Sequence, residues 1–180
     1  VIRLRKTSMV ILNRHIPSTL ADADLQQLSV GTHPQQAQAI KVALQSGFTL
    51  ITGGPGTGKT FTLVRILIAL LQQNSQLTVA LAAPTGKAAA RMQEALRQSL
   101  AQLPVAQQLL KALPQTAFTL HRLLGMGHGT QPKFNAQQPL PYDLIIVDEA
   151  SMIDLRMASQ LLTAISPNAR LILLGDANQL

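Results

Sequence analysis

Apolar residues follow a helical period in some segments of the chain and form short unbroken runs in others. Residues 33–46 place Ala37, Ile40 and Leu44 on one face and precede Gly47, a common stop signal, which predicts a helix. Similar periods predict helices over residues 58–73, 86–103, 105–113, 119–124 and 155–165. Apolar runs predict strands over residues 48–52, 77–82, 144–147 and 171–174. Apolar strands alternating with helices are covered on both faces, so we predict an α/β fold with a mostly parallel central sheet flanked by helices.

Two segments do not follow this alternation. Residues 1–33 mix basic residues with short apolar runs, and we interpret them as a connector or the tail of a preceding domain, with a short helix around residues 21–28. Residues 126–142 contain three Pro, two Gly and several Gln without a helical period. This interval is either a loose surface loop or a small inserted hairpin. The main domain is therefore predicted to comprise residues 34–180.

The composition excludes several classes of protein. The 180 residues include no Cys and no Trp, and 47% are hydrophobic against 13% charged, which excludes a disordered chain, a disulfide framework and a thiolate zinc site. The longest apolar stretch, residues 61–71, is about half of the ~20 residues that a membrane span requires. No signal peptide is apparent, so we expect a cytoplasmic protein.

The balance of charge is basic, with 15 Lys and Arg against 8 Asp and Glu, or a net +7. Cationic side chains that neutralise phosphates release counterions and gain affinity, so a polyanionic partner is one interpretation. A basic surface without such a partner is the other, and charge alone leaves both open.

A glycine-rich loop follows the first predicted strand and opens the next predicted helix. Residues 53–60 satisfy G-x-x-x-x-G-K-[ST] at every position. Glycine suits this loop because a backbone with positive φ turns its N–H groups inward around a phosphate. Lys59 can reach the β- and γ-phosphates, and the Thr60 hydroxyl can hold Mg²⁺. The predicted nucleotide-binding residues of the loop are Gly53, Gly54, Pro55, Gly56, Thr57, Gly58, Lys59 and Thr60.

Two carboxylates, Asp148 and Glu149, directly follow the strand predicted at residues 144–147. This position is the carboxyl edge of the sheet, where α/β folds bind ligands. Alone, such a pair is more often a charge at a helix N-terminus. Beside the phosphate loop, we interpret Asp148 as a second Mg²⁺ ligand and Glu149 as the group that polarises the attacking water. The sequence therefore predicts a nucleoside triphosphatase core with Lys59, Asp148 and Glu149 as catalytic residues.

Five segments resemble, in order, motifs I, Ia, Ib, II and III of superfamily 1 DNA helicases. They are residues 53–60, 83–91, 119–125, 147–154 and 174–180. Within that superfamily the chain is most similar to the RecD family, the alpha subunits of bacterial exodeoxyribonuclease V, over residues 34–180. The resemblance implies a RecA-like P-loop NTPase domain.

The resemblance also implies roles for individual residues. Gln36 would read the adenine edge, because an amide can both donate and accept hydrogen bonds. Gln179 would sense the γ-phosphate as a further catalytic residue, with Asp176 supporting its loop. The implied DNA-binding residues are Pro84, Thr85, Gly86, Lys87, Thr119 and His121. For two of these the alternative is structural: Thr85 as an ordinary helix N-cap, and His121 as a helix residue without a ligand.

The function implied by the resemblance is that of the first motor domain of an ATP- and Mg²⁺-dependent helicase. It would move 5′ to 3′ along single-stranded DNA in double-strand-break repair, in the bacterial cytoplasm, with RecB- and RecC-like subunits, one of which would carry the nuclease site. We expect the chain to be a piece of a larger polypeptide that alone binds ATP but hydrolyses it poorly. The alternatives are a small-molecule P-loop kinase and a nucleotide-binding subunit with a mainly structural role.

Overall fold

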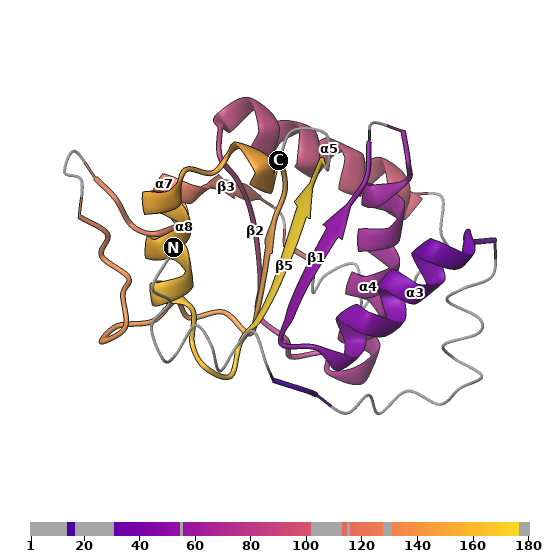
Figure 1. Ribbon diagram of the computed structural model, residues 1–180, viewed down its shortest axis with the longest axis horizontal. Helices are drawn as coiled ribbons and strands as arrows, with labels where there is room; N and C mark the ends of the chain where they lie inside the picture. The colour runs from indigo at the N-terminus through magenta and orange to yellow at the C-terminus, as the bar shows by residue number, and fades with distance from the viewer. Residues whose placement is uncertain are drawn as a thin grey trace.

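Five parallel strands form one sheet in the order β1-β5-β4-β2-β3. The computed structural model describes residues 14–16, 31–54, 56–101, 113–114, 116–127 and 131–176. The strands are β1 (Phe48–Thr52), β2 (Val79–Ala83), β3 (Ala117–Thr119), β4 (Leu144–Val147) and β5 (Arg170–Gly175). Because the strands are parallel, their carboxyl ends meet at one edge, toward which the arrows of β1 and β5 point in Figure 1.

Helices cover both faces of this sheet (Figure 1). The helices are α3 (Pro34–Gln45), α4 (Lys59–Gln73), α5 (Gly86–Ala101), α7 (Leu120–Leu123) and α8 (Leu155–Ala164), with a short 3₁₀ turn η1 (Ala150–Met152). Leu144 and Ile146 of β4 pack in the core that contains α3, α4 and α5. Ile145 and Val147 pack in the core that contains α7 and α8. The apolar runs of the sequence therefore reflect strands buried on both sides.

The predicted α/β fold is confirmed, and the sheet is parallel throughout the described residues. The strands predicted at residues 48–52 and 144–147 have these bounds, and the other two predicted strands differ by one or two residues at their ends. The helix predicted over residues 119–124 is shorter, because Thr119 ends β3 and its hydroxyl accepts the Arg122 N–H as an N-cap. The helices predicted at residues 21–28 and 105–112 lie outside the described residues, and Leu113 is buried but not helical.

Residues 131–142 form a coil that is anchored at both ends. The N–H groups of Lys133 and Phe134 donate to the Leu124 carbonyl, and the N–H of Leu140 donates to the Ala164 carbonyl at 2.7 Å. Leu140 is buried beside α8. Residues 126–127 and 131–142 contain no paired strand, and residues 128–130 lie outside the described part of the chain. A small insertion over residues 126–142 remains a prediction.

Residues 14–16 pair with the turn between α3 and β1. His15 forms an antiparallel bridge with Ser46, and the Ile16 N–H donates to the Gln45 carbonyl at 2.7 Å. The Arg14 guanidinium donates to the carbonyls of residues 167 and 168, which precede β5. This short segment is therefore joined to the amino edge of the sheet.

In the described residues no helix is both long enough and apolar enough to span a bilayer.

Arg170, at the start of β5, ties this strand to the end of α3. Its side chain is buried, and Nη1 donates to the carbonyls of Ala43, Leu44 and Ser46 at 3.0–3.2 Å. Burial, with a smaller effect of the nearby Arg14, lowers the pKa of Arg170 to about 10. The guanidinium thus stays charged at neutral pH, where it complements the negative end of the α3 dipole.

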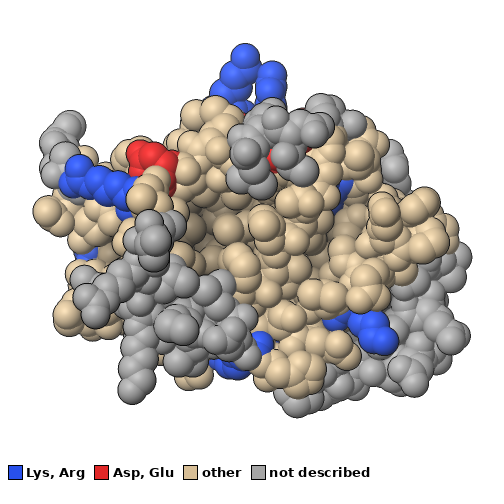
Figure 2. All heavy atoms as spheres, viewed as in Figure 1, with Lys and Arg blue, Asp and Glu red and all other residues tan. Residues whose placement is uncertain are grey.

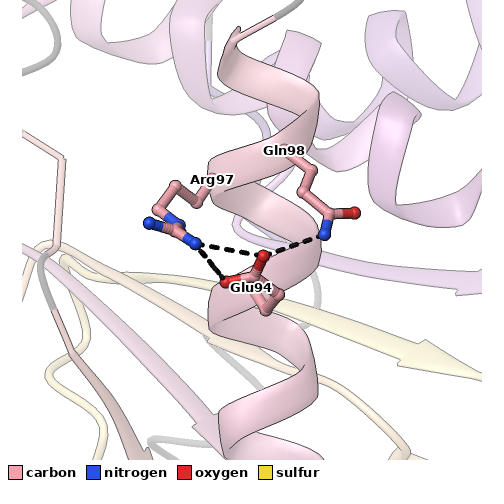
Figure 3. A network of polar contacts seen from close by, with 3 residues as sticks. All are labelled: Glu94, Arg97 and Gln98. Carbon is pink, nitrogen blue, oxygen red and sulfur yellow. Dashed lines mark hydrogen bonds and ion pairs between the residues drawn. The ribbon is translucent and has the colours of Figure 1, made fainter.

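We expect Arg170→Met to lower the free energy of unfolding by about 3 kcal/mol, because hydrogen bonds from a charged donor are lost and buried carbonyls are left unpaired. Urea denaturation of the chain measures the change. The matched control is Arg97→Met on α5, where Arg97 pairs with Glu94 at 2.9 Å on the surface (Figure 3). Exposed ion pairs contribute little to stability, so the urea midpoint of Arg97→Met should match that of the wild type. Equal shifts for both variants would contradict the role of Arg170.

Candidate functional site

The loop between β1 and α4 is held by close contacts between its own residues and to β5. The Gly53 N–H donates to the Gly175 carbonyl at the end of β5 (3.2 Å), and the Thr57 hydroxyl donates to the Gly54 carbonyl (2.8 Å). A Cβ on Gly53 would lie 2.6 Å from Thr57 Oγ1, so any other residue here would displace the Thr57 hydroxyl from its contact with Gly54. Gly58 has a φ of +78°, in the left-handed region that favours glycine. The loop therefore needs the glycines that its motif supplies.

Lys59 is the first residue of α4, and its ammonium lies within the loop. Nζ donates to the carbonyl of Gly53 and, at 3.0 Å, to that of Gly54. The helix has Gly58 as its N-cap, which offers no side-chain acceptor to the N–H groups of the first turn. Such N–H groups, the helix dipole and an adjacent cation together attract an anion. The geometry of the loop suits a phosphate group.

Gln36 connects α3 to this loop. Its Nε2 donates to the Thr57 carbonyl at 3.0 Å, and its Oε1 accepts from the N–H of His33, the N-cap of α3, at 3.1 Å. A cleft of about 360 Å³ begins at the loop and continues between α3 and β1. Its lining includes Gln36, Ala39, Val42, Leu50, Gly53 and Lys59. A nucleotide with its phosphates in the loop would have this cleft beside its base.

Asp148 and Glu149 form the turn after β4. The Asp148 N–H donates to the Ala82 carbonyl at 2.9 Å, which continues the pairing with β2 by one residue. Asp148 Oδ1 accepts the Glu149 N–H at 2.8 Å. Glu149 has a φ of 52° and a ψ of 40°, a left-handed conformation that costs a non-glycine residue about 1–2 kcal/mol. Both side chains are half-buried, so the turn presents two carboxylates at the sheet edge.

The strand order brings the loop and the acidic turn to the same part of the edge. β5 is the one strand between β1 and β4, so the ends of β1 and β4 lie about 10 Å apart for strands spaced by about 4.8 Å. The Gly53 contact to Gly175 also joins the loop to the end of β5. A triphosphate in the loop would therefore extend toward Asp148 and Glu149.

The residues expected to bind DNA lie at the same edge, at the ends of β2 and β3. Thr85, Gly86 and Lys87 are exposed at the start of α5, and Thr85 Oγ1 accepts the Ala88 N–H at 3.2 Å. Figure 2 shows Lys and Arg side chains projecting at the top of the molecule, where Figure 1 places α5. His121 is exposed on α7. Thr85 and Thr119 thus act as helix caps, and their roles in DNA binding remain predictions.

Some predicted residues lie outside the part of the chain that the structure describes. These are Pro55 of the loop and Gln179 after β5. Two backbone contacts of the site were not identified from the sequence. The His33 N–H donates to Gln36 Oε1, and the Gly175 carbonyl accepts the Gly53 N–H. The position of His33 directly before Pro34, with Gln36 at the third position of the helix, was a signal for a helix start.

The oxygen donors at this edge fit a magnesium ion that arrives with a nucleotide. Mg²⁺ prefers hydroxyl and carboxylate oxygens and takes one or two carboxylates together with phosphate oxygens and waters. The Thr60 hydroxyl lies in the first turn of α4, and the Asp148 carboxylate follows β4. Within the described residues, no three His, Cys, Asp or Glu side chains are grouped to hold a metal by themselves. The donor set therefore fits an ion that depends on phosphate for further ligands.

Comparison with known proteins gives matches in sequence and in fold. The model of a family described as "AAA domain" matches residues 36–180. The RecBCD enzyme subunit RecD of Haemophilus influenzae is 41% identical over 94% of this chain and 26% of its own length, and that of Mycobacterium tuberculosis is 45% identical over 87% and 28%. The ATP-dependent RecD2 DNA helicase of Deinococcus radiodurans is 39% identical over 83% of this chain and 18% of its own length.

Solved structures share the fold at low sequence identity. The UvsW helicase of bacteriophage T4 superposes with a TM-score of 0.63 at 11% identity, over 93% of this chain and 36% of that chain. A second crystal structure of the same helicase gives a TM-score of 0.62.

The RecD relatives are much longer than this chain, which spans about a quarter of their length.

Proposed function

Because this chain belongs to the AAA domain family, we propose that it is the ATP-driven motor domain of a DNA helicase similar to RecD. The proposal is carried by one observation: the phosphate loop, the Asp148-Glu149 turn and the exposed start of α5 all emerge at one edge of a parallel sheet. A motor must join a nucleotide site to a nucleic-acid site, and the strand ends bring the two candidates together.

The chemistry of nucleotide hydrolysis follows from the residues at this edge. The loop N–H groups and Lys59 would hold the phosphates and offset the charge that develops on them. Glu149 would accept a proton from the attacking water, a role that suits a carboxylate held at a fixed position. Thr60 and Asp148 would hold Mg²⁺, which neutralises phosphate charge when bound. Gln179 completes the proposed catalytic set, and Gln36 the proposed base contact.

The proposed substrate is single-stranded DNA, along which the protein moves 5′ to 3′. Support comes from the relatives, whose names include RecBCD enzyme subunit RecD and ATP-dependent RecD2 DNA helicase. RecB- and RecC-like subunits are therefore the proposed partners, and the bacterial cytoplasm is the proposed location. A nucleotide-binding subunit with a structural role, or a small-molecule kinase, is not favoured, since one of these relatives is named an ATP-dependent DNA helicase and the others are named subunits of the RecBCD enzyme.

Binding of single-stranded DNA by this chain, measured by fluorescence anisotropy over a series of salt concentrations, tests the proposal. We expect Lys87→Ala to weaken binding and to reduce the slope of log K against log salt by about 1, as loss of one phosphate contact does. The control is Lys41→Ala, which removes another exposed cation, from α3. Equal effects of the two variants would indicate a diffuse basic surface. Absence of DNA binding in the wild type would contradict the proposed function.

A further inference from the structure

The hydrogen bond between Gln36 and the Thr57 carbonyl connects the residue expected to contact the base with the loop expected to hold the phosphates. We propose that Gln36 is a positioning residue, which holds the Thr57–Gly58 peptide so that the Gly58 N–H faces a bound phosphate. This inference rests on the proposed nucleotide site, but it assigns Gln36 an effect on ligands that have no base.

The direction of the Gly58 N–H follows from the planarity of the peptide. In a trans peptide the carbonyl and the following N–H point in opposite directions, and the described residues contain no cis peptide. The Thr57 carbonyl points to Gln36 Nε2 on α3, at 3.0 Å. The Gly58 N–H therefore points away from Gln36 and α3, and it directly precedes Lys59, whose ammonium contacts the Gly53 and Gly54 carbonyls of the same loop.

Gln36 is itself held in place, which allows it to orient another group. It is the third residue of α3, and its Oε1 accepts the His33 N–H at 3.1 Å, so both ends of the amide have partners. A Cβ on Gly58 would lie 2.5 Å from Gln36 Nε2, which shows how closely the amide approaches the loop. Without this contact the peptide before Gly58 could rotate easily, because glycine restricts its own backbone little.

A phosphate ligand without a base separates positioning from base reading. We would measure binding of tripolyphosphate and of ATP to the 180-residue chain by calorimetry. Gln36→Ala should weaken tripolyphosphate binding by about fivefold, the effect of one hydrogen bond, and should weaken ATP binding by at least as much, because the proposed base contact is lost as well. Gln72→Ala, an exposed glutamine at the far end of α4, is the matched control and should change neither. Loss of affinity for ATP alone, with tripolyphosphate binding unchanged, would overturn the inference.

An NMR spectrum of the ligand-free chain gives a second readout, which does not depend on ligand binding. The Gly58 amide resonance should shift in Gln36→Ala and in Gln36→Glu, but not in Gln72→Ala. The Glu variant keeps an acceptor for the His33 N–H, so α3 stays capped while the donor to Thr57 is lost. An unmoved Gly58 resonance in both Gln36 variants would refute the positioning role. If the wild type bound neither ligand, the proposed function would fail while this readout still decided the inference.

Discussion

Lys59→Ala should weaken ATP binding by about a hundredfold, since hydrogen bonds from a charged donor contribute about 1.5–3 kcal/mol each and 1.4 kcal/mol corresponds to tenfold. The structure gives the physical reason. The ammonium already lies among the carbonyls of Gly53 and Gly54, at the start of a helix without a side-chain cap. A triphosphate would exchange these neutral acceptors for charged ones. Calorimetry with ATP and Mg²⁺ measures the loss.

The control for Lys59 must remove a positive charge without touching the loop. Lys41→Ala on α3 does so, because Lys41 is exposed and does not line the cleft. We expect its ATP affinity to match the wild type, and circular dichroism should show both variants folded. If Lys59→Ala bound ATP as tightly as Lys41→Ala, the loop would not be the phosphate site.

The fold was predictable where burial leaves a plain pattern in the sequence. β4 consists of four apolar residues because both of its faces are covered, and its bounds were predicted correctly. β3 was missed because three residues are too few to show a period, and Phe118 lies between a predicted helix and an irregular segment. The order of the strands was not predicted, since it depends on pairing between residues far apart in the sequence, such as Phe48 with Leu171.

The candidate site was predictable in its side chains and unpredictable in its backbone. The motif identified Lys59 and Thr60 because each carries a functional group with a known role at a known spacing. It did not identify the Gly175 carbonyl, which accepts the Gly53 N–H, or the Thr57 carbonyl, which accepts from Gln36. Every residue has a carbonyl, so only the fold reveals which ones are used.

Glu149→Gln should reduce ATP hydrolysis by about 10²–10⁴-fold, the usual contribution of a general base, while ATP affinity stays near that of the wild type. The carboxylate follows β4 at the sheet edge and is separate from the loop that would hold the phosphates. The amide of Gln has nearly the same shape but cannot accept a proton from water. Hydrolysis should be measured in the full-length protein that carries this domain, with DNA present, beside nucleotide binding.

The backbone conformation of Glu149 provides a second variant, which differs from Glu149→Gln in its effect on stability. Glu149→Gly should raise the free energy of unfolding by about 1 kcal/mol, because glycine adopts the left-handed conformation without strain. Glu149→Gln keeps the strain and should leave stability unchanged. Both variants should stop hydrolysis and DNA unwinding. In Glu149→Gly the loss of activity should accompany a gain in stability, whereas in Glu149→Gln stability should stay unchanged. A subunit that binds nucleotide only for assembly would retain the activity of its complex in both variants. Normal unwinding by Glu149→Gln would therefore refute the proposed motor.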